Sequence, residues 1–365
     1  MVRVLALTRW PRSAASSRQR FLAFASFLAR HDIELTVRPF FDEAYISRVN
    51  SGLKANSMEL MAHYGRRLSE LSKRGRYDLL WIEKEALPQI PYHLEALFLG
   101  NSKILLDLDD AWHLRTQASP LRHLLAGKIE RLSRRADGLT VANAALKAWA
   151  VQAGVPESKV TLVPTGLDVN LYESAPEPDG PFTLGWIGGP FTTEYLESIE
   201  RPLRRLSSEG VHLLVVGENR ELDRLGGIRL EQHPWSEATE SKLLSRCHVG
   251  ISPLLHDGWS QFKSGYKLIQ YMAAGRPAVA SPIGANCDVM AAEETGLFAT
   301  SEAEWYSQIN RLRQDSDLRR RLGRQARLRC EQMFSIEALG GHLTRLMHQL
   351  AREPVSPRRL DPLEE

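Results

Sequence analysis

Two lysines, Lys263 and Lys267, lie where a loop containing Ser264 and Gly265 leads into an amphipathic helix. If the helix starts near Lys263, the two lysines share one face, because residues four apart are neighbours on a helix surface. The first turn of a helix offers free N–H groups and the positive end of the helix dipole, so this site favours an anion such as a nucleoside diphosphate. The alternative is an ordinary helix with two solvated lysines.

A pair of glycines, Gly188 and Gly189, ends a strand expected at 182–189. Thr192 and Thr193 follow, where the next helix should open. Glycines at such a position let the backbone approach a phosphate closely. A glycine turn between a strand and a helix is also common without any ligand, and that alternative stays open.

Acidic residues follow two strands expected in the first half of the chain. Asp107, Asp109 and Asp110 lie at the end of the strand 103–108, and Glu85 follows the strand 77–82. Carboxylates crowded together raise one another's pKa, which is more typical of a functional site than of a solvated surface. The alternatives are that Asp109 or Asp110 caps a turn and that Glu85 is solvated.

Basic residues in the first half could meet anions in two ways. Arg18 and Arg20, between the first strand and the first helix, could meet a phosphate from the opposite side of a cleft. Two basic helices could contact anionic lipid or a lipid-diphosphate acceptor, although solvated faces are the alternative. Nucleic acid is a poorer partner, because no basic patch with interleaved aromatic residues is present. The basic residues of the two helices are Arg66, Arg67, Lys73, Arg74 and Arg76, and Arg122, Lys128, Arg131, Arg134 and Arg135.

Strands and helices alternate along both halves of the chain, and this alternation must position the residues above. Continuous apolar runs of strand length are typical of parallel strands buried on both faces. The pattern predicts two Rossmann-like doubly wound α/β domains that face each other across a cleft, with ligands beyond the carboxyl ends of the strands. The expected strands are 3–8, 33–40, 77–82, 103–108, 138–143, 159–164, 182–189, 211–217, 228–235, 248–254, 277–281 and 296–300. The expected helices are 18–30, 53–74, 121–135, 144–152, 193–207, 236–245, one that ends at Gly275, more than one within 302–334, and 336–352.

Length and composition indicate two domains of unlike charge. A chain of 365 residues is long for one domain, and a stretch rich in proline and glycine interrupts the alternation. We expect an N-terminal domain at 1–170, a linker at 171–181, a C-terminal domain at 182–334, a final helix at 335–352 and a disordered tail at 353–365. The first 170 residues carry 24 Lys and Arg against 17 Asp and Glu, whereas the remainder carries 23 against 27. A basic half beside an acidic half predicts different partners for the two domains.

The cysteines and the apolar runs bear on the compartment. Cys247, Cys287 and Cys330 are far apart, which suits a reducing cytoplasm better than a disulfide framework. No run reaches the roughly 20 apolar residues of a membrane span, and Arg9 and Arg12 interrupt the apolar start of the chain. We therefore expect a cytoplasmic protein, with any membrane contact peripheral and at the inner face.

The chain resembles the GT-B fold glycosyltransferases of family 4, also called group 1, over most of its length from Arg3 to Leu350. The motifs that carry the resemblance are LGWIGG followed by TTEYL, HPWSEATESKLLSRCHVGISPL, and above all KSGYKLIQYMAAGRPAVASPIGAN. The motifs DLDDAW and SSRQR in the first half are similar to one branch of that family.

The resemblance implies a glycosyltransferase that moves a sugar from a nucleoside-diphosphate-sugar to a glycan or lipid-linked acceptor, with retention at the anomeric carbon. It implies an acceptor held mainly by the first domain and a last helix that crosses back to that domain. It implies no metal and no cofactor, since basic side chains and a helix N-terminus balance the leaving-group charge. The donor-binding residues that it implies in the second domain are Gly188, Gly189, Pro234, Trp235, Lys263, Ser264, Gly265, Tyr266, Lys267 and Gln270.

Three departures from the family pattern affect the expected site. Phe262 and Gln270 occupy the places of two glutamates, and only Gln270 can still hydrogen-bond a ribose hydroxyl. Thr193 and Tyr195 lie where an arginine and a lysine are usual, and we expect the two lysines of the later motif to compensate. The aspartate cluster replaces a histidine, so we expect Asp110 or Asp109 to orient or deprotonate the acceptor hydroxyl.

Three other functions are compatible with the same residues. A metal-dependent transferase would use Asp107 and Asp109, which form a D-x-D pattern that also arises by chance. A nucleotide-sugar epimerase could share the fold. A catalytically silent nucleotide-sugar-binding subunit would explain the replaced glutamates.

Overall fold

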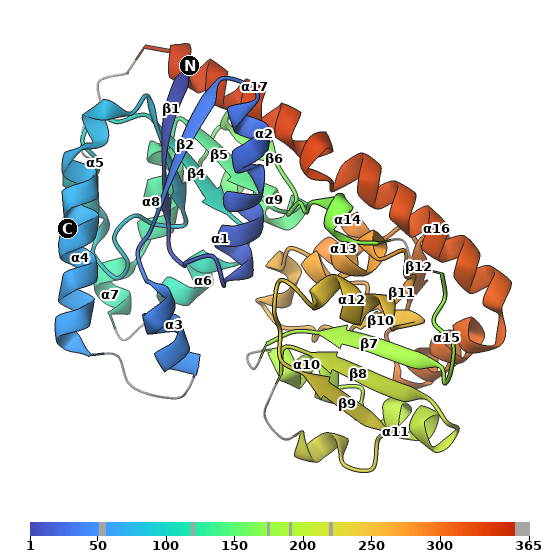
Figure 1. Cartoon of the computed structure of the whole chain (residues 1–365). Helices are drawn as coiled ribbons and strands as arrows, with labels where there is room; N and C mark the ends of the chain where they lie inside the picture. The colour runs from blue at the N-terminus through green and yellow to red at the C-terminus, as the bar shows by residue number, and fades with distance from the viewer. Residues whose placement is uncertain (51–55, 118–120, 174–175, 190–191, 219–221, 355–365) are drawn as a thin grey trace. The chain divides into compact units, whose positions relative to one another are not determined.

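The chain folds into two α/β units. The computed structural model describes residues 1–50, 56–117, 121–173, 176–189, 192–218 and 222–354 (Figure 1). The first unit comprises Met1–Gly166 and Leu339–Glu365, and the second comprises Leu167–Ala338. The division at Gly166 falls before the linker expected at 171–181, so that linker lies within the second unit. The tail expected at 353–365 lies outside the described residues from residue 355 onward.

The first unit is built on a parallel six-stranded sheet with the order β2-β1-β3-β4-β5-β6. Every residue of β3 and β4 is buried, as expected for strands covered on both faces. The strand order reverses at the neighbours β1 and β3, and ligands of such sheets bind beyond the carboxyl ends at this reversal. The strands are β1 (Val2–Thr8), β2 (Ile33–Pro39), β3 (Leu79–Glu83), β4 (Ile104–Leu108), β5 (Gly138–Val141) and β6 (Val160–Leu162).

Three helices of the first unit differ from the sequence-based prediction. The helix expected at 18–30 is divided into α1, η1 and α2, and the helix expected at 121–135 is interrupted at Gly127, whose φ is +64°. The start of the helix expected at 53–74 lies outside the described residues, and α4 begins at Ser57. The helical segments are α1 (Ala15–Arg20), η1 (Leu22–Phe24), α2 (Ala25–Ala29), α3 (Glu43–Asn50), α4 (Ser57–Ser72), η2 (Arg74–Arg76), α5 (Tyr92–Leu99), α6 (Trp112–Gln117), α7 (Arg122–Leu125), α8 (Lys128–Arg135), α9 (Ala144–Gln152) and η3 (Glu157–Lys159).

The final helix, α17 (Ile336–Arg352), packs on the first unit over most of its length (Figure 1). A Cβ atom at Gly340 would lie only 2.5 Å from Phe27, and one at Gly138 would lie 3.0 Å from Leu350, so both glycines favour the close approach of helix and unit. Lys103 donates to the carbonyl of Ala351 at 2.8 Å and thereby caps the end of the helix.

The second unit contains a parallel six-stranded sheet with the order β12-β11-β10-β7-β8-β9. Its order reverses at the neighbours β7 and β10, as in a doubly wound sheet. The predicted fold class, two Rossmann-like doubly wound units, is confirmed, whereas a cleft between them stays a prediction. The strands are β7 (Thr183–Ile187), β8 (His212–Val216), β9 (Leu230–His233), β10 (Val249–Ser252), β11 (Ala278–Ala280) and β12 (Gly296–Phe298).

Three helices of the second unit also differ from the prediction. The helix expected at 236–245 spans only Glu240–Ser245. The helix expected at 193–207 is divided into α10 and α11, with Ser198 and Ile199 between them. The helix of the lysine motif starts at Tyr266, three residues later than a start near Lys263. None of the described helices has the length and apolar character that a membrane crossing requires. The helical segments are η4 (Val169–Leu171), α10 (Thr193–Glu197), α11 (Glu200–Ser208), η6 (Asp223–Leu225), α12 (Glu240–Ser245), η7 (Ser260–Phe262), α13 (Tyr266–Ala273), α14 (Ala285–Val289), α15 (Glu302–Gln314) and α16 (Ser316–Met333).

Candidate functional site

The two predicted glycines follow β7, at the point where the strand order of the second sheet reverses. A Cβ atom at Gly188 would lie 2.6 Å from both the Trp186 ring and the Thr192 Oγ1, so only glycine fits there. A Cβ atom at Gly189 would meet nothing within 4 Å. The backbone at Gly189 is therefore accessible, as a phosphate-binding turn requires.

The ammonium of Lys267 lies beside this turn. Its Nζ is 4.2 Å from the centroid of the Trp186 ring and 3.5 Å from the Thr192 Oγ1. Within the described part of the chain, no carboxylate lies within ion-pairing distance of Lys267. Burial, together with the nearby charge of Lys263, lowers the pKa of Lys267 to about 7. A partly buried cation beside a second cation, with no acidic partner among the described residues, favours the binding of an anion.

Lys263 approaches this site from a loop and not from the helix. Gly265, whose φ is +66°, opens α13, so Lys263 lies between η7 and the helix. The prediction that the two lysines share a helical face is therefore wrong. The Nζ of Lys263 lies 4.7 Å from the centroid of the Tyr195 ring. No side chain in the described part of the chain caps α13, which leaves the first N–H groups of the helix available to a ligand.

Other residues expected to bind the donor surround the same end of the sheet. Gln270 is 3% exposed within α13, and Phe262, at the place of the first expected glutamate, is 8% exposed and packs in the apolar core. Pro234 is exposed just after β9. The indole N–H of Trp235 donates to Glu240 Oε2 at 2.5 Å, which fixes the orientation of its ring.

Sequence reasoning missed one buried acid in this region. Glu218 is fully buried, follows Gly217 at the end of β8, and accepts a hydrogen bond from Thr193 Oγ1 at 2.7 Å. Gly217 has a φ of +102°, and a Cβ atom there would lie 2.7 Å from the carbonyl oxygen of Gly188. The signal was present as a glycine and an acid directly after the apolar run 211–216.

Asp107 and Arg20 bind each other in the first unit, so both expected roles require correction. The guanidinium of Arg20 donates from Nε and Nη2 to the two carboxylate oxygens of Asp107, each at 2.6 Å. Thr140 Oγ1 also donates to Asp107 at 2.5 Å, and Arg20 is 3% exposed. Since Asp107 is 1% exposed, neither residue is accessible to a substrate. Asp107 is not a catalytic residue, and Arg20 is not a phosphate or acceptor contact.

Glu85 is likewise a structural residue and not the accessible carboxylate that the sequence predicted. It accepts hydrogen bonds from Lys128 at 2.6 Å, Arg9 at 2.7 Å and Trp112 Nε1 at 3.2 Å, and it is 4% exposed. Burial alone would raise the pKa of Glu85, but Lys128 and Arg9 outweigh burial and hold the pKa below its ordinary value. Lys128 also pairs with Glu95 at 2.7 Å.

Three other basic residues are buried and form their hydrogen bonds and ion pairs within the first unit. Lys128 is fully buried and Arg67 is 1% exposed, so neither can contact a lipid surface as expected. Arg67 donates to the carbonyl oxygen of Thr8 at 2.8 Å. Arg18 is 4% exposed and donates to two carbonyl oxygens of the loop after β1, each at 3.1 Å, so its expected phosphate contact also requires correction.

Asp109 and Asp110 keep their candidate role. Their side chains are 13% and 26% exposed, and both face the ammonium of Lys84, at 2.9 Å and 3.5 Å respectively. Burial would raise the pKa of Asp109, but Lys84 and Arg20 hold it below its ordinary value. Sequence reasoning missed Lys84, although its position directly after β3 indicated a candidate site residue.

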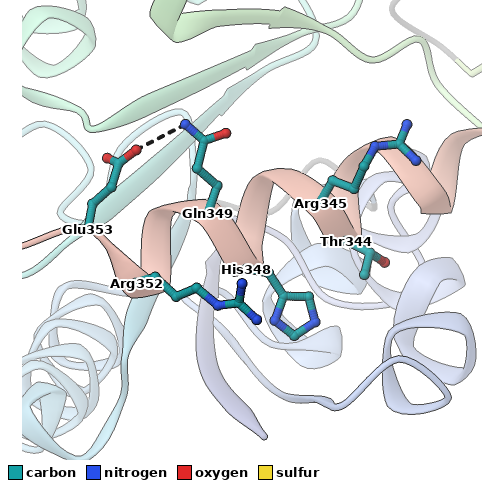
Figure 2. A pocket seen from close by; sticks show the side chains of 6 residues that line it. All are labelled: Thr344, Arg345, His348, Gln349, Arg352 and Glu353. Atoms are coloured by element: carbon teal, nitrogen blue, oxygen red, sulfur yellow. Dashed lines mark hydrogen bonds between the residues drawn. The ribbon is translucent and has the colours of Figure 1, made fainter.

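A depression on α17 and an acidic cluster lie outside these sites. A depression of about 510 Å³ lies on α17, but Figure 2 shows that Arg345 and Arg352 point to different sides of the helix and do not converge on a ligand. Among the described residues, Asp42, Glu59 and His63 form the one group of acids and histidines close enough to share a metal ion. Arginine side chains already contact this group. Arg66 Nη2 lies 2.7 Å from His63 Nδ1, and Arg48 Nη1 lies 3.0 Å from Glu59 Oε2.

One protein-family model matches part of the second unit. The family model described as "Glycosyl transferases group 1" matches residues 192–315, which include α10, the lysine loop and α13. No curated protein sequence matches the chain.

Three solved structures share the fold of the whole chain. HepE of Anabaena in complex with UDP-glucose is 16% identical, with a TM-score of 0.72 over 96% of this chain and 100% of that chain. Sucrose-phosphate synthase from Thermosynechococcus elongatus is 16% identical, with a TM-score of 0.70 over 96% and 99% of the two chains. WaaG, a glycosyltransferase involved in lipopolysaccharide biosynthesis, is 14% identical, with a TM-score of 0.69 over 95% and 99%. At these identities the likeness shows the fold, the two-unit GT-B architecture predicted from the sequence.

Proposed function

We propose that this chain is a glycosyltransferase that moves a sugar from a nucleoside-diphosphate-sugar to a hydroxyl of a glycan or lipid-linked acceptor. The observation that carries the proposal is the pair of ammonium groups of Lys263 and Lys267 beside the uncapped start of α13, with no described carboxylate paired to Lys267. A diphosphate would supply the anionic partner that Lys267 lacks among the described residues. The family match over residues 192–315 and the UDP-glucose complex of HepE support the same ligand class.

The residues of the two units would have different roles in the transfer reaction. In the second unit, the lysines and the N–H groups of α13 stabilise the charge that develops on the diphosphate as its bond to the sugar breaks. The turn at Gly188 and Gly189 would admit the phosphates, whereas Gln270 is 3% exposed and would contact a ribose only if its side chain became accessible. In the first unit, Asp109 or Asp110 would orient the acceptor hydroxyl and take its proton as the new bond forms. We further propose retention at the anomeric carbon and a role in polysaccharide biosynthesis.

The pairing of Asp107 disfavours a metal-dependent mechanism through the D-x-D pattern. Both oxygens of Asp107 bind Arg20, and Asp109 pairs with Lys84, so both carboxylates already have cationic partners. We therefore propose transfer without a metal or a cofactor. Turnover that disappears with a chelator and returns with a divalent cation would contradict this part of the proposal.

Assays over a panel of nucleotide sugars, with and without glycan and lipid-linked acceptors, test the transferase proposal. Transfer that requires both substrates, and that falls in the Lys267→Ala variant, is the expected result. Nucleotide binding by calorimetry without turnover on any acceptor would favour a silent binding subunit. A changed sugar without any acceptor would favour an epimerase.

An exposed apolar face on α5 supports peripheral contact with a membrane. Leu94, Leu97 and Phe98 are 50%, 57% and 42% exposed and lie at helical spacing, so they share one face. On α7, Leu124 is 63% exposed beside the exposed Arg122. Apolar side chains next to cations are typical of a surface that docks on anionic lipid. We propose a cytoplasmic protein that docks at the inner face of the membrane.

Sedimentation with anionic and neutral vesicles tests this docking. The wild type should sediment with anionic vesicles, and Leu97→Ser combined with Phe98→Ser should abolish this. Equal sedimentation of the variant and the wild type would contradict membrane docking through α5.

A further inference from the structure

Lys84 has a backbone conformation that lysine does not favour. Its φ is +64°, directly after the last residue of β3, and its N–H donates to the carbonyl oxygen of Asp107 at 2.9 Å. Glycine and asparagine adopt this left-handed region more readily than a residue with a long side chain. A lysine held in this region indicates that its side chain is needed where the backbone places it.

The side chain of Lys84 is buried among acids. It is 3% exposed, and its Nζ lies 2.9 Å from Asp109 Oδ1, 3.5 Å from Asp110 Oδ2 and 4.0 Å from Glu83 Oε1. The ring of Trp112 borders the same ammonium, with its centroid 4.8 Å away. Burial disfavours the charge of Lys84, but the three carboxylates raise its pKa above the ordinary value, so Lys84 stays charged at neutral pH.

Of these acids, Glu83 also accepts hydrogen bonds from other residues. Its Oε2 accepts hydrogen bonds from the Arg9 N–H at 2.8 Å and from Ser17 Oγ at 2.7 Å. The positive charge of Arg20 on α1 also lowers the pKa of Asp109. Asp110 is the most exposed of the acids around Lys84, with 26% of its side chain accessible. The cluster lies at the reversal of strand order between β1 and β3, where ligands of such sheets bind.

We propose that Lys84 is a positioning residue, whose ammonium holds Asp109 and orients Asp110 so that the Asp110 carboxylate can receive the proton of an acceptor hydroxyl. This inference rests on the proposed glycosyl transfer. In that step the hydroxyl oxygen forms its bond to the anomeric carbon and its proton passes to the Asp110 carboxylate. The bond from the anomeric carbon to the diphosphate breaks, and its electron pair stays on the phosphate oxygen.

Three variants at position 84 test the inference by pH profiles of kcat/KM. Lys84→Met removes the charge, Lys84→Arg retains it, and Lys84→Gly removes it while relieving the left-handed backbone. We expect Lys84→Met and Lys84→Gly to lower kcat about 100-fold at neutral pH, with the donor KM unchanged. The acid limb of their pH profiles should move to higher pH, because Asp109 loses the cation that lowers its pKa. Lys84→Arg should recover most of the activity and the wild-type profile.

The matched control is Gln89→Gly, at an exposed position of the same segment whose φ is +57°. This change should leave the pH profile unaltered. Binding of UDP to each variant checks that the second unit is intact. Should Lys84→Met fail to fold, Lys84→Gly supplies the measurement, because glycine suits this backbone.

A second readout separates the failure of this inference from failure of the proposed function. Carbon-13 NMR of labelled aspartate carboxyls measures the pKa of Asp109 without any turnover, and we expect it to rise in Lys84→Met. If the wild type turns over, and if Lys84→Met keeps the wild-type pKa of Asp109 and the wild-type pH profile, the positioning role alone is overturned. A wild type without turnover on any acceptor would overturn the proposed transfer and, with it, the role of Lys84.

Discussion

The ammonium of Lys267 lies 4.2 Å from the centroid of the Trp186 ring and has no described carboxylate partner. The ring stabilises the cation through its negative face, but this contact contributes only about 0.5–2 kcal/mol. Burial and the charge of Lys263 act in the opposite direction and lower the pKa of Lys267 to about 7. Lys267 is therefore a cation whose charge the protein alone does not fully stabilise, and a bound diphosphate would supply the missing anion.

The first prediction concerns the pH dependence of donor binding. A bound diphosphate favours the charged form of Lys267, so affinity should be highest below pH 7 and should fall as the pH rises through about 7. Between pH 6 and pH 8 we expect the Kd for UDP-glucose to rise up to about tenfold. Isothermal calorimetry at both pH values measures this. In the Lys267→Arg variant, whose charge does not titrate in this range, the pH dependence should disappear, and its persistence would contradict the assignment.

The second prediction concerns the ligand-free protein. The pKa of Lys267 is about 7 in the folded chain and near 10.5 when unfolded, so the unfolded chain binds more protons between these values. Stability of the wild type should therefore rise with pH across this window. Lys267→Met removes the poorly stabilised charge and should raise the stability of the ligand-free protein at pH 7 by about 1 kcal/mol, while abolishing stabilisation by UDP. Denaturant unfolding with and without UDP measures both effects, and a destabilised ligand-free variant would contradict the prediction.

The third prediction uses the accessible turn after β7. Since a Cβ atom at Gly189 would meet no protein atom within 4 Å, Gly189→Ala should leave the unfolding free energy nearly unchanged. The same methyl group would occupy space that a phosphate needs, so we expect the Kd for UDP to rise about tenfold or more. Gly258→Ala is the matched control, because its Cβ atom would also meet no neighbour and lies outside the expected phosphate turn. Equal UDP affinity of both variants would show that no ligand approaches Gly189.

The fourth prediction concerns the buried ion pairs of the first unit. Lys128 lies 2.6 Å from Glu85 and 2.7 Å from Glu95, and its replacement by methionine leaves two buried carboxylates without their cation. We expect Lys128→Met to lower the unfolding free energy by about 3–5 kcal/mol. Urea denaturation measures the loss, with Arg122→Ala on the surface as the control. A loss below about 1 kcal/mol would show that the pairing does not stabilise the fold.

The sequence was informative wherever the controlling signal is local. The apolar run 77–82 corresponds to β3 at Leu79–Glu83, and the helix expected at 336–352 is α17 at Ile336–Arg352. Interruptions were harder to predict, since the break between α7 and α8 depends on one glycine at positive φ within an otherwise helical pattern. The start of α13 depends in the same way on Gly265.

The roles of the charged residues depended on partners that are distant in the sequence. Asp107 follows an apolar run, as a catalytic acid would, but its partner Arg20 is 87 residues away. The role of Glu85 was similarly ambiguous, because its partner Lys128 lies 43 residues further along the chain. The sequence pattern also predicted a surface position for Lys128. The lysine loop was predictable because glycine, lysine and helix start are adjacent, whereas the contact of Lys267 with Trp186 needed the fold.

Calorimetric titration with UDP tests the central claim most directly, by comparing the wild type with a variant that carries Lys263→Ala and Lys267→Ala. The wild type should bind UDP, and loss of two charged contacts should weaken binding by at least about 100-fold. The exposed pair Arg201→Ala and Arg205→Ala on α11 is the control and should bind as the wild type does. Equal affinity of the lysine variant and the wild type would contradict the assignment of this loop and helix as the diphosphate site.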